Sequence, residues 1–459
     1  MRWAVGPTDD RRLIGLALLV APALGVAAVI KPLYVVLAPV AFALIAIAMT
    51  NLALGVAALT LLAFFERLPG STGIPLTKPL GLVLVLSWLG ALSRRDATMP
   101  ILTRDHPIIS YALFALVVWG AGSAAWATDP ATAIASAIRL ALVAILFFVV
   151  YSAIRTPSDL RAVVWAFLLG AFLTSLMALV TGKTVAGRLT AGFLDPNFLA
   201  AALASSIVIA GFMLTVTSGP SRLVLLGFVL TYVVALVLTQ SRGGLLATAV
   251  ALAVSCVVAG PVRTQTVAIV VIAAAIGLTY YVALAPPSLR QRVTDVSAQG
   301  SASRTDTWQI ALQMTRDHPL LGIGLGNFRV VESRYIPGNL NLLQAPEVLK
   351  NRLVTHNTYL EVLSELGTIG LALLLGIIAA SLATAWRGIG LAGGTMIPAS
   401  LVARGLVAGT IALLAAYVFL SGEYEKLLWL LLGLLTAIPT VTRAAIARPP
   451  APHNPPINL

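Results

Sequence analysis

Apolar runs long enough to cross a membrane recur along almost the whole chain, and this feature constrains the fold more than any other. A helix of about 20 apolar residues crosses the hydrocarbon core of a bilayer. Candidate runs lie at about residues 13–30, 33–50, 52–65, 79–93, 108–124, 134–153, 159–180, 197–216, 222–239, 243–260, 267–285, 357–382, 400–420 and 426–441. This pattern predicts an all-α polytopic membrane protein with about 12 to 14 transmembrane helices.

The composition agrees with a membrane location and excludes several other classes. The chain is 59% hydrophobic and 10% charged, whereas a soluble domain is about 25% charged. The net charge of +13 comes from Lys and Arg scattered between the apolar runs, so no nucleic-acid partner is expected. The single cysteine, Cys256, lies inside an apolar run, which excludes an intramolecular disulfide and a cysteine-based metal site.

The positive residues also predict an orientation. Arg2, Arg11 and Arg12 precede the first apolar run, which we interpret as a retained helix rather than a cleaved signal peptide. With the N-terminus in the cytoplasm, the cytoplasmic loops hold about twice as many Lys and Arg as the short outer loops, as the positive-inside rule requires. We therefore expect a bacterial inner-membrane protein with both termini in the cytoplasm.

One connection, residues 286–356, is far longer than the others and falls on the periplasmic side in this orientation. Long loops in compact proteins usually carry function. It divides the chain into N-terminal transmembrane helices (1–285), the periplasmic loop (286–356), C-terminal transmembrane helices (357–441) and a cytoplasmic tail (442–459).

Part of this loop is expected to be folded. After Ser303 the pattern predicts an amphipathic helix whose apolar face carries Trp308, Ala311, Leu312 and Thr315. His318-Pro319 should end it, and Gly322, Gly324 and Gly326 should form a tight turn. These glycines are not a dinucleotide-binding motif, because Asn327 stands where the motif needs glycine.

Three arginines are predicted at the outer membrane edge, where the topology signal selects against positive charge: Arg188, Arg242 and Arg304. Arginine near a membrane tends to face a cavity and serve function, and its planar guanidinium binds phosphate oxygens in pairs. A shared pyrophosphate site is one interpretation. The other is that each arginine pairs with a lipid headgroup or with an acidic neighbour such as Asp195 or Asp306.

Only two histidines, His318 and His356, are predicted outside the cytoplasm. His318 precedes a proline and is typical of a helix end. His356 opens a helix that enters the membrane with a polar stripe of Asn357, Glu361, Ser364 and Glu365. The two carboxylates need partners at that depth, and the outer arginines are the expected ones.

An imidazole with its ordinary pKa of about 6.5 can accept a proton from a sugar hydroxyl. The outer loops lack paired His or clustered Asp with metal-ligand spacing. We therefore expect no metal and no cofactor.

These motifs resemble the O-antigen ligase and O-antigen polymerase superfamily, which includes exopolysaccharide polymerases and pilin oligosaccharyltransferases. The matching residues, within about 180–385, are Gly187-Arg188-Leu189 followed by Asp195-Pro196-Asn197, then Ser241-Arg242-Gly243-Gly244, Arg304 with Trp308 and Asp317-His318-Pro319, and His356-Asn357 with Tyr359 and Glu361.

The resemblance implies a metal-independent, inverting glycosyl transfer at the periplasmic face. The donor would be a glycan on undecaprenyl pyrophosphate, and the acceptor would be a hydroxyl of lipid A core or of a carrier-linked glycan. Carried over to this sequence, His356 is the catalytic base and Arg242, Arg304 and Arg188 hold the pyrophosphate. Asn357, Tyr359 and Glu361 would orient His356 or line the acceptor path.

Alternatives remain open from the sequence. The same constellation serves a ligase, which we favour slightly, and an O-antigen or exopolysaccharide polymerase. A small-anion transporter, for example for bicarbonate uptake, is a different class, but its expected repeated halves and mid-membrane broken helices are not evident. A structural scaffold would leave the Arg and His residues without a purpose.

Overall fold

The computed structural model describes residues 43–65, 77–94, 99–182, 184–185, 187–191, 195–279, 282–283, 299–335, 354–393 and 398–447. The predicted span at 13–30 and most of the span at 33–50 lie outside these residues. The described part is helical apart from a two-stranded antiparallel hairpin, β1 (Thr184–Val185) with β2 (Arg188–Leu189). The prediction of an all-α polytopic membrane protein is confirmed.

The helices begin where the sequence offers a proline or a side-chain cap. Proline is the first residue of α6 (Pro107–Gly122), α7 (Pro130–Ala153), α8 (Pro157–Thr181), α9 (Pro196–Val216), α10 (Pro220–Thr239) and α18 (Pro398–Ala416). Proline suits that position because its missing N–H has no helical partner there. Asp129, Thr156 and Asp195 cap three of these helices by accepting backbone N–H groups.

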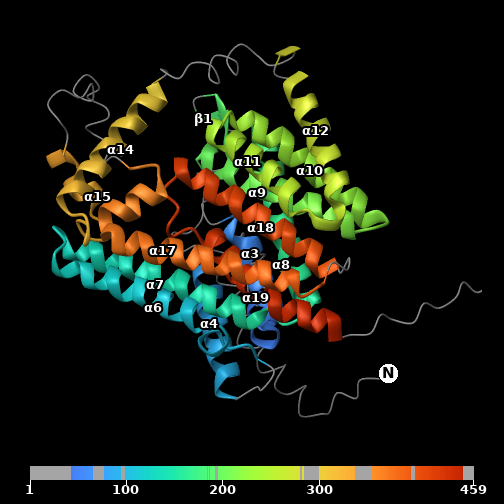
Figure 1. Cartoon of the computed structure of the whole chain (residues 1–459), viewed down its shortest axis with the longest axis horizontal. Coiled ribbons are helices and arrows are strands. Elements are labelled where there is room, and N and C mark those ends of the chain that lie inside the picture. The colour runs from blue at the N-terminus through green and yellow to red at the C-terminus, as the bar shows by residue number, and fades with distance from the viewer. Residues whose placement is uncertain are drawn as a thin grey trace, which may run out of the picture.

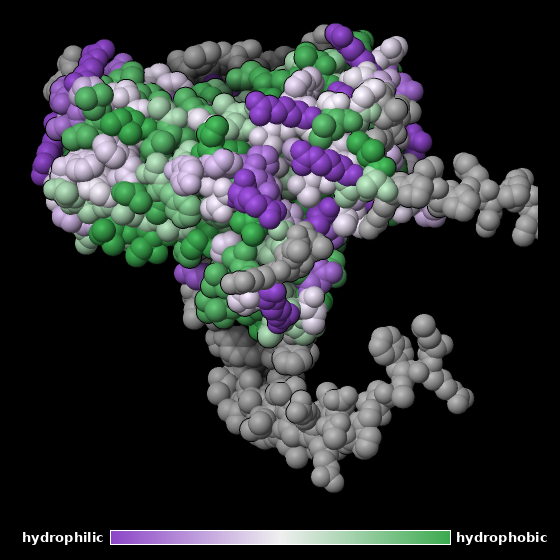
Figure 2. All heavy atoms as spheres, turned by 60° about the horizontal axis from the view of Figure 1, so that its bottom comes forward, coloured by the Kyte–Doolittle hydropathy of each residue, from purple (hydrophilic) through white to green (hydrophobic). Residues whose placement is uncertain are grey.

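Eight helices in the described part are long and apolar enough to cross a membrane, or nine if one bent pair forms a single span. They include α17 (Thr358–Gly390) and α19 (Lys426–Ala447), and α19 continues past the predicted end at residue 441. Two shorter apolar helices, α3 (Leu52–Ala63) and α4 (Thr77–Ser93), occupy the third and fourth predicted runs. Hydrophobic residues cover much of the middle of the body in Figure 2.

Two groups of helices form the bundle. In one, α9 packs against α18, α10 and α11 (Arg242–Val258), and in the other α17 and α19 pack against α6 and α7. Contacts of α18 with α17 and α19 join the groups (Figure 1). Helix α9 is the most central of the first group, with side chains from Pro196 to Met213 buried along most of its length.

The bundle has two ends, and hydrogen bonds between residues far apart in the sequence show which helix ends lie together. At the first, which we call the site end, the Asp129 backbone before α7 meets Asn327, and Thr358 at the start of α17 meets Leu420 after α18. At the opposite end, Tyr151 near the end of α7 donates a hydrogen bond to Asp105. Helix α7 therefore runs from the site end to the opposite end, as the predicted alternation of loops requires.

The predicted spans at 243–260 and 267–285 form a bent pair. A short 3-10 turn, η2 (Gly260–Val262), separates α11 from α12 (Arg263–Thr279), and the two axes differ by 105°. Gly260 has φ 56° in the left-handed region, and Arg404 packs against it. Helix α12 extends away from the other helices at the edge of the bundle (Figure 1).

Helix α17 is broken near its N-terminal end, at the site end of the bundle. Gly367 has φ 68° and ψ −170° inside the helix, a conformation open to glycine and strained for other residues. The loop that follows α14 (Gln299–Asp317) supplies the missing partners, because Thr368 N–H donates to the Pro319 carbonyl at 2.9 Å and Ile323 N–H donates to the Ser364 carbonyl at 3.0 Å.

The glycines of this loop confirm the predicted tight turn. Gly322, Gly324 and Gly326 all have positive φ. A side chain on Gly322 would collide with the Glu365 backbone. A side chain on Gly324 would meet Ala127, and one on Gly326 would meet Ser136. The loop thus fits against the broken helix and against the start of α7 only because these positions have no Cβ.

Helix α14 forms a small second core on α17 (Figure 1), so the described part of the long loop is folded as predicted. One detail of its predicted face is wrong. Leu312 is 43% exposed, whereas Ile310 and Met314 are buried with Ala311 against Phe328. The buried stripe of α14 is Ile310, Ala311 and Met314, because this side of the helix packs against α15 (Phe328–Val331) and the turn before it.

Candidate active site

Arg188 lies at the centre of a hydrogen-bond network that joins β2, α9, α10 and α11 at the site end. From β2, its Nε donates to the Thr239 carbonyl at the end of α10 at 2.9 Å, and its Nη2 donates to Asn197 Oδ1 in α9 at 2.7 Å. Ser241, which caps α11, donates to the same Asn197 oxygen at 2.8 Å. Arg188, a predicted pyrophosphate ligand, therefore joins the end of α10 to the start of α9, and Asn197 connects this pair to the start of α11.

Arg242 is the first residue of α11, directly after the Ser241 cap. Gln240 before it has φ 49°, which turns the chain sharply between α10 and α11. The two glycines that follow permit close packing, because a Cβ on Gly244 would lie 2.4 Å from Ala200 Cβ and one on Gly243 would lie 3.1 Å from the Phe419 ring. The sequence Ser-Arg-Gly-Gly thus places a guanidinium at a tightly packed helix N-terminus.

Arg304 lies on α14, and its helix is tied to the segment that carries His356. One turn after Arg304, Trp308 Nε1 donates to the Thr355 carbonyl at 3.1 Å, and Thr307 Oγ1 lies 3.3 Å from the same oxygen. The Trp308 ring also packs 6.3 Å from that of Phe419, which contacts Gly243. This chain of contacts connects the helices of Arg304 and Arg242.

His356 lies in the left-handed backbone region, with φ 49°. Its neighbour Asn357 caps α17 by accepting the N–H groups of Tyr359 and Leu360 at 3.0 Å. Burial lowers the pKa of His356, and the nearby charge of Arg304 lowers it further, while Asp195 acts in the opposite direction. The imidazole is therefore neutral at ordinary pH and able to accept a proton.

The charges of the same residues also act on Arg304. Burial lowers the pKa of Arg304, Asp195 raises it and Arg242 lowers it. Arg242, Arg304, His356 and Asp195 thus come from four separate elements and lie within electrostatic reach of one another. We call these four residues the site cluster.

The other predicted orienting residues have different partners. Tyr359 donates through its hydroxyl to the Leu414 carbonyl of α18 at 2.8 Å, so it joins α17 to α18. Glu361 Oε2 accepts a 2.7 Å hydrogen bond from Thr355 Oγ1, one residue before His356. Asn357 and Glu361 therefore act on the segment around His356, whereas Tyr359 bonds away from it.

The predicted partners of the buried carboxylates are corrected by the structure. We expected outer arginines to bind Glu361 and Glu365, but Thr355 binds Glu361, and the N–H groups of Gly326 and Phe328 bind Glu365 at 2.7 and 3.1 Å. Backbone N–H groups in a tight loop can serve a buried carboxylate without a second charge. The hydrogen-bond donors to Glu361 and Glu365 are therefore a hydroxyl and backbone N–H groups, and not the arginines that we expected.

Three residues near His356 were missed as parts of the site. Asp195 appeared in the sequence only as a possible ion-pair partner. Arg329, on α15, lowers the pKa of His356 through its charge, and its place directly after the glycine turn was the only signal. Thr355 gave no signal in the sequence, because its role depends on contacts with α14 and with the loop after α18. His318 is exposed at the end of α14.

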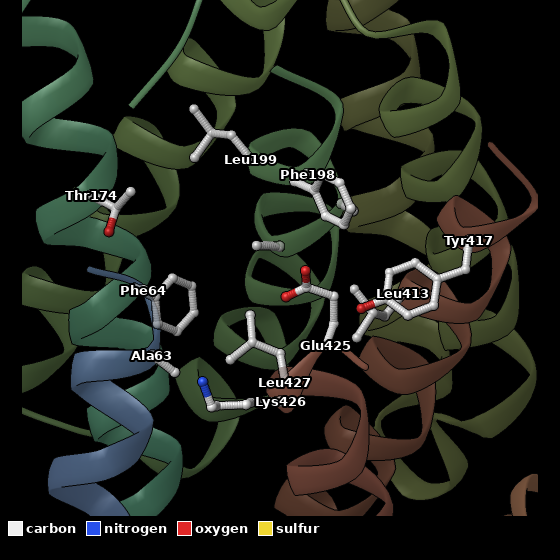
Figure 3. Close-up of a pocket in the computed structure, with 12 residues that line it drawn as sticks. Ala63, Phe64, Thr174, Phe198, Leu199, Leu413, Tyr417, Glu425, Lys426 and Leu427 are labelled. Atoms are coloured by element: carbon white, nitrogen blue, oxygen red, sulfur yellow. The ribbon is translucent and has the colours of Figure 1, made fainter. Parts of the chain in front are cut away.

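An elongated apolar pocket lies beside the first turn of α9 (Figure 3). Its cavity volume is about 50 Å³. Phe64, Phe198, Leu413 and Leu427 line it, and the polar groups of Glu425 and Lys426 reach it from the start of α19 (Figure 3). Phe198 follows Asn197 in sequence, so the pocket adjoins the segment that Arg188 holds.

Among the described residues, no three His, Cys, Asp or Glu side chains are grouped closely enough to hold a metal ion. The polar chemistry of the site end consists of guanidinium groups, one imidazole and hydrogen-bonded carboxylates. Such a set binds anions and moves protons.

The fold and the site define a polytopic membrane protein with a basic, histidine-containing site at one end of its helical bundle. A family model described as O-antigen ligase matches residues 227–375. This match supports the resemblance to the O-antigen ligase and polymerase superfamily over that region, which contains Arg242, Arg304 and His356. No curated protein matches the chain.

Proposed function

We propose that the protein is a glycosyltransferase that moves a glycan from undecaprenyl pyrophosphate to an acceptor hydroxyl at the periplasmic face of the inner membrane. The O-antigen ligase match supports the reaction type. The observation that carries the proposal is the site cluster, in which two buried or half-buried guanidinium groups and a neutral imidazole from separate elements share one electrostatic environment.

In the proposed mechanism, His356 accepts the proton of the acceptor hydroxyl while that oxygen attacks the anomeric carbon. A new C–O bond forms as the bond between the anomeric carbon and the pyrophosphate oxygen breaks, and the pyrophosphate leaves with the electron pair. A single displacement inverts the anomeric centre. No metal or other cofactor takes part.

Arg242 and Arg304 are proposed to bind the departing pyrophosphate, whose negative charge grows in the transition state. Fixed guanidinium groups aimed at such charge lower the barrier. Arg188 is proposed as a further ligand, and its bonds to Asn197 and Thr239 also fix the helix starts around the site. Asn357, Tyr359 and Glu361 are proposed to orient His356 or to line the acceptor path.

The apolar pocket supports a lipid-linked donor. Its lining of Phe64, Phe198, Leu413 and Leu427 is apolar, as a contact with part of an isoprenoid chain requires, and it adjoins the start of α9. Lys426 at its edge carries the charge that a pyrophosphate headgroup attracts. The proposed donor would thus lie with its chain among the helices and its headgroup near the arginines.

The first prediction tests the catalytic base. Purified protein in liposomes, supplied with undecaprenyl-pyrophosphate glycan and an acceptor, should form product, and a chelator should leave the rate unchanged. His356→Ala should reduce the rate at least about 100-fold, since a positioned base contributes about 10²–10⁴-fold. His318→Ala, an exposed histidine in the same loop, is the control and should keep normal activity.

Near-normal transfer by correctly folded His356→Ala protein would refute the assignment of the base. Separate reactions with lipid A core and with a carrier-linked repeat distinguish a ligase, which we propose, from a polymerase with the same chemistry. Labelled bicarbonate uptake that depends on the protein, without transfer, would favour the transporter instead.

A further inference from the structure

The backbone of His356 is held in an unfavourable conformation. Its φ of 49° lies in the left-handed region, which costs a residue with a Cβ about 1–2 kcal/mol. Such a conformation persists only when the surrounding structure determines it, and it is typical of functional sites. The contacts on either side of His356 therefore identify what keeps the imidazole in place.

The residue before His356 is bound through both of its polar groups. The Thr355 carbonyl accepts a hydrogen bond from Trp308 Nε1 at 3.1 Å, and Thr307 Oγ1 lies 3.3 Å from the same oxygen. The Thr355 hydroxyl donates to Glu361 Oε2 at 2.7 Å and lies 3.3 Å from Ser421 Oγ. Thr355 is completely buried, so each of these bonds replaces one that water cannot supply.

The residues after His356 are bound to the connection between α18 and α19. Thr358 donates to the Leu420 carbonyl through both its N–H and its hydroxyl, at 2.8 and 2.7 Å, and the Gly422 N–H donates to the Thr358 hydroxyl at 2.8 Å. Asn357 caps α17 between these points. His356 is thus the one residue of 355–358 whose side chain makes no hydrogen bond to the described residues, and its flanks are fixed.

The bonds to Thr355 also set the distance between His356 and Arg304. Thr307 and Trp308 follow Arg304 on α14, and Thr307 Oγ1 donates to the Arg304 carbonyl at 2.9 Å. Any movement of Thr355 relative to α14 therefore changes the separation of the imidazole and the guanidinium.

We propose that Thr355 is a positioning residue for His356, held by Trp308 from α14 and by Glu361 from α17, and that this clamp aims the imidazole at the reacting hydroxyl beside Arg304. The proposal rests on the proposed function of His356 as the base. Of the two roles proposed above for Glu361, this scheme takes the orientation of His356; Thr355, Trp308 and Glu361 all act through His356 and touch neither substrate.

The experiment compares four variants of the full-length protein in liposomes. Trp308→Phe removes the Nε1–H donor and part of the ring system but keeps an aromatic ring beside Phe419, and Thr355→Val removes the hydroxyl that binds Glu361. Thr355→Ser restores that hydroxyl. Trp119→Phe is the matched control, because Trp119 Nε1 makes an equivalent 3.0 Å bond to the Leu366 carbonyl, away from His356.

We expect Thr355→Val to lower kcat about 100-fold and Trp308→Phe to lower it about tenfold, because a misplaced catalytic group costs up to about 10²-fold. The donor KM should change little, since Arg242 and Arg304 remain. Thr355→Ser and Trp119→Phe should keep the wild-type kcat. A wild-type kcat in both Thr355→Val and Trp308→Phe would overturn the proposal, as would an equal fall in Trp119→Phe.

A second measurement does not depend on transfer. Diethyl pyrocarbonate modifies neutral imidazole, so its rate at His356, followed by mass spectrometry of the peptide across pH, reports the pKa. Loosening the clamp hydrates the ring, so this pKa should rise toward its ordinary value in Trp308→Phe. An unchanged pH profile of His356 modification in Trp308→Phe would overturn the positioning role. If the wild-type protein shows no transfer but Trp308→Phe still shifts this profile, only the proposed function is refuted.

Discussion

His356 combines a neutral ring with charged neighbours of opposite effect. Burial and Arg304 lower its pKa, and Asp195 raises it. A general base works only when it is neutral, so the transfer rate should rise with pH through the pKa of His356 and be level above it. The midpoint of this rise should lie below the ordinary histidine value of about 6.5.

Two substitutions should move this midpoint in opposite directions. Arg304→Gln removes a positive neighbour, which makes protonation easier, so the pKa rises and the acidic limb moves to higher pH. Asp195→Asn removes the negative neighbour, so the limb moves to lower pH, and asparagine still caps α9. Profiles of kcat against pH measure both shifts, and movement in the same direction would contradict the site cluster.

Residue types and residue partners differ in how far the sequence reveals them. Arg242, Arg304 and His356 stand out as candidates in the sequence because two arginines are expected at the outer edge and a histidine opens an apolar helix, and their catalytic roles stay predictions. Their surroundings could not be predicted, because Asn197, Thr355 and Asp195 become partners only through folding. The same reason explains why backbone N–H groups, and not arginines, bind Glu365.

At the scale of elements, the break in α17 determines the shape of the site end. Thr368 bonds to Pro319 and the Ile323 N–H bonds to Ser364, so the loop after α14 and the broken helix complete each other. The Glu365 carboxylate accepts two further hydrogen bonds, from the N–H groups of Gly326 and Phe328. The junction therefore joins the loop after α14 to α17 around Gly367.

Gly367→Ala should therefore destabilise the protein. Its φ of 68° disfavours alanine, and a Cβ would lie 2.1 Å from the Leu320 carbonyl oxygen. We expect a loss of about 2 kcal/mol or more in unfolding free energy, measured by thermal unfolding in detergent. Gly376→Ala, in the same helix with open space around it, should be neutral or stabilising by up to about 1 kcal/mol, and equal destabilisation by both would contradict this role of Gly367.

The helices themselves could be predicted from apolar runs and prolines, since both act locally. The 105° bend between α11 and α12 could not, although Gly260-Pro261 marked the position, because an apolar run carries no information on the angle to the next run. The break in α17 has the same cause. Gly367 stands in an otherwise regular helical pattern, and its partner loop lies more than 40 residues earlier.

For the whole molecule, the contacts at the two ends of the bundle agree with the alternation of loops predicted from charge. The proposed orientation puts the site end in the periplasm and the end of α19 in the cytoplasm. Cys256 is the only cysteine, so its replacement by serine gives a background for introduced cysteines.

In that background, Leu321→Cys beside α14 and Ile446→Cys near the end of α19, both exposed, test the orientation. A membrane-impermeant maleimide added to intact spheroplasts should label Leu321→Cys, and it should label Ile446→Cys only after permeabilisation. The reverse pattern would place the site cluster in the cytoplasm and refute a periplasmic reaction.

The bonds between Thr358 and the Leu420–Gly422 connection have a consequence for biosynthesis. The ribosome makes His356 well before it makes Leu420, so the imidazole acquires its final support only when the penultimate helix has been inserted. A nascent chain halted before that point carries every charged group of the site cluster but lacks the brace behind the histidine. Under the proposed function, activity should accordingly begin only after this late step of synthesis.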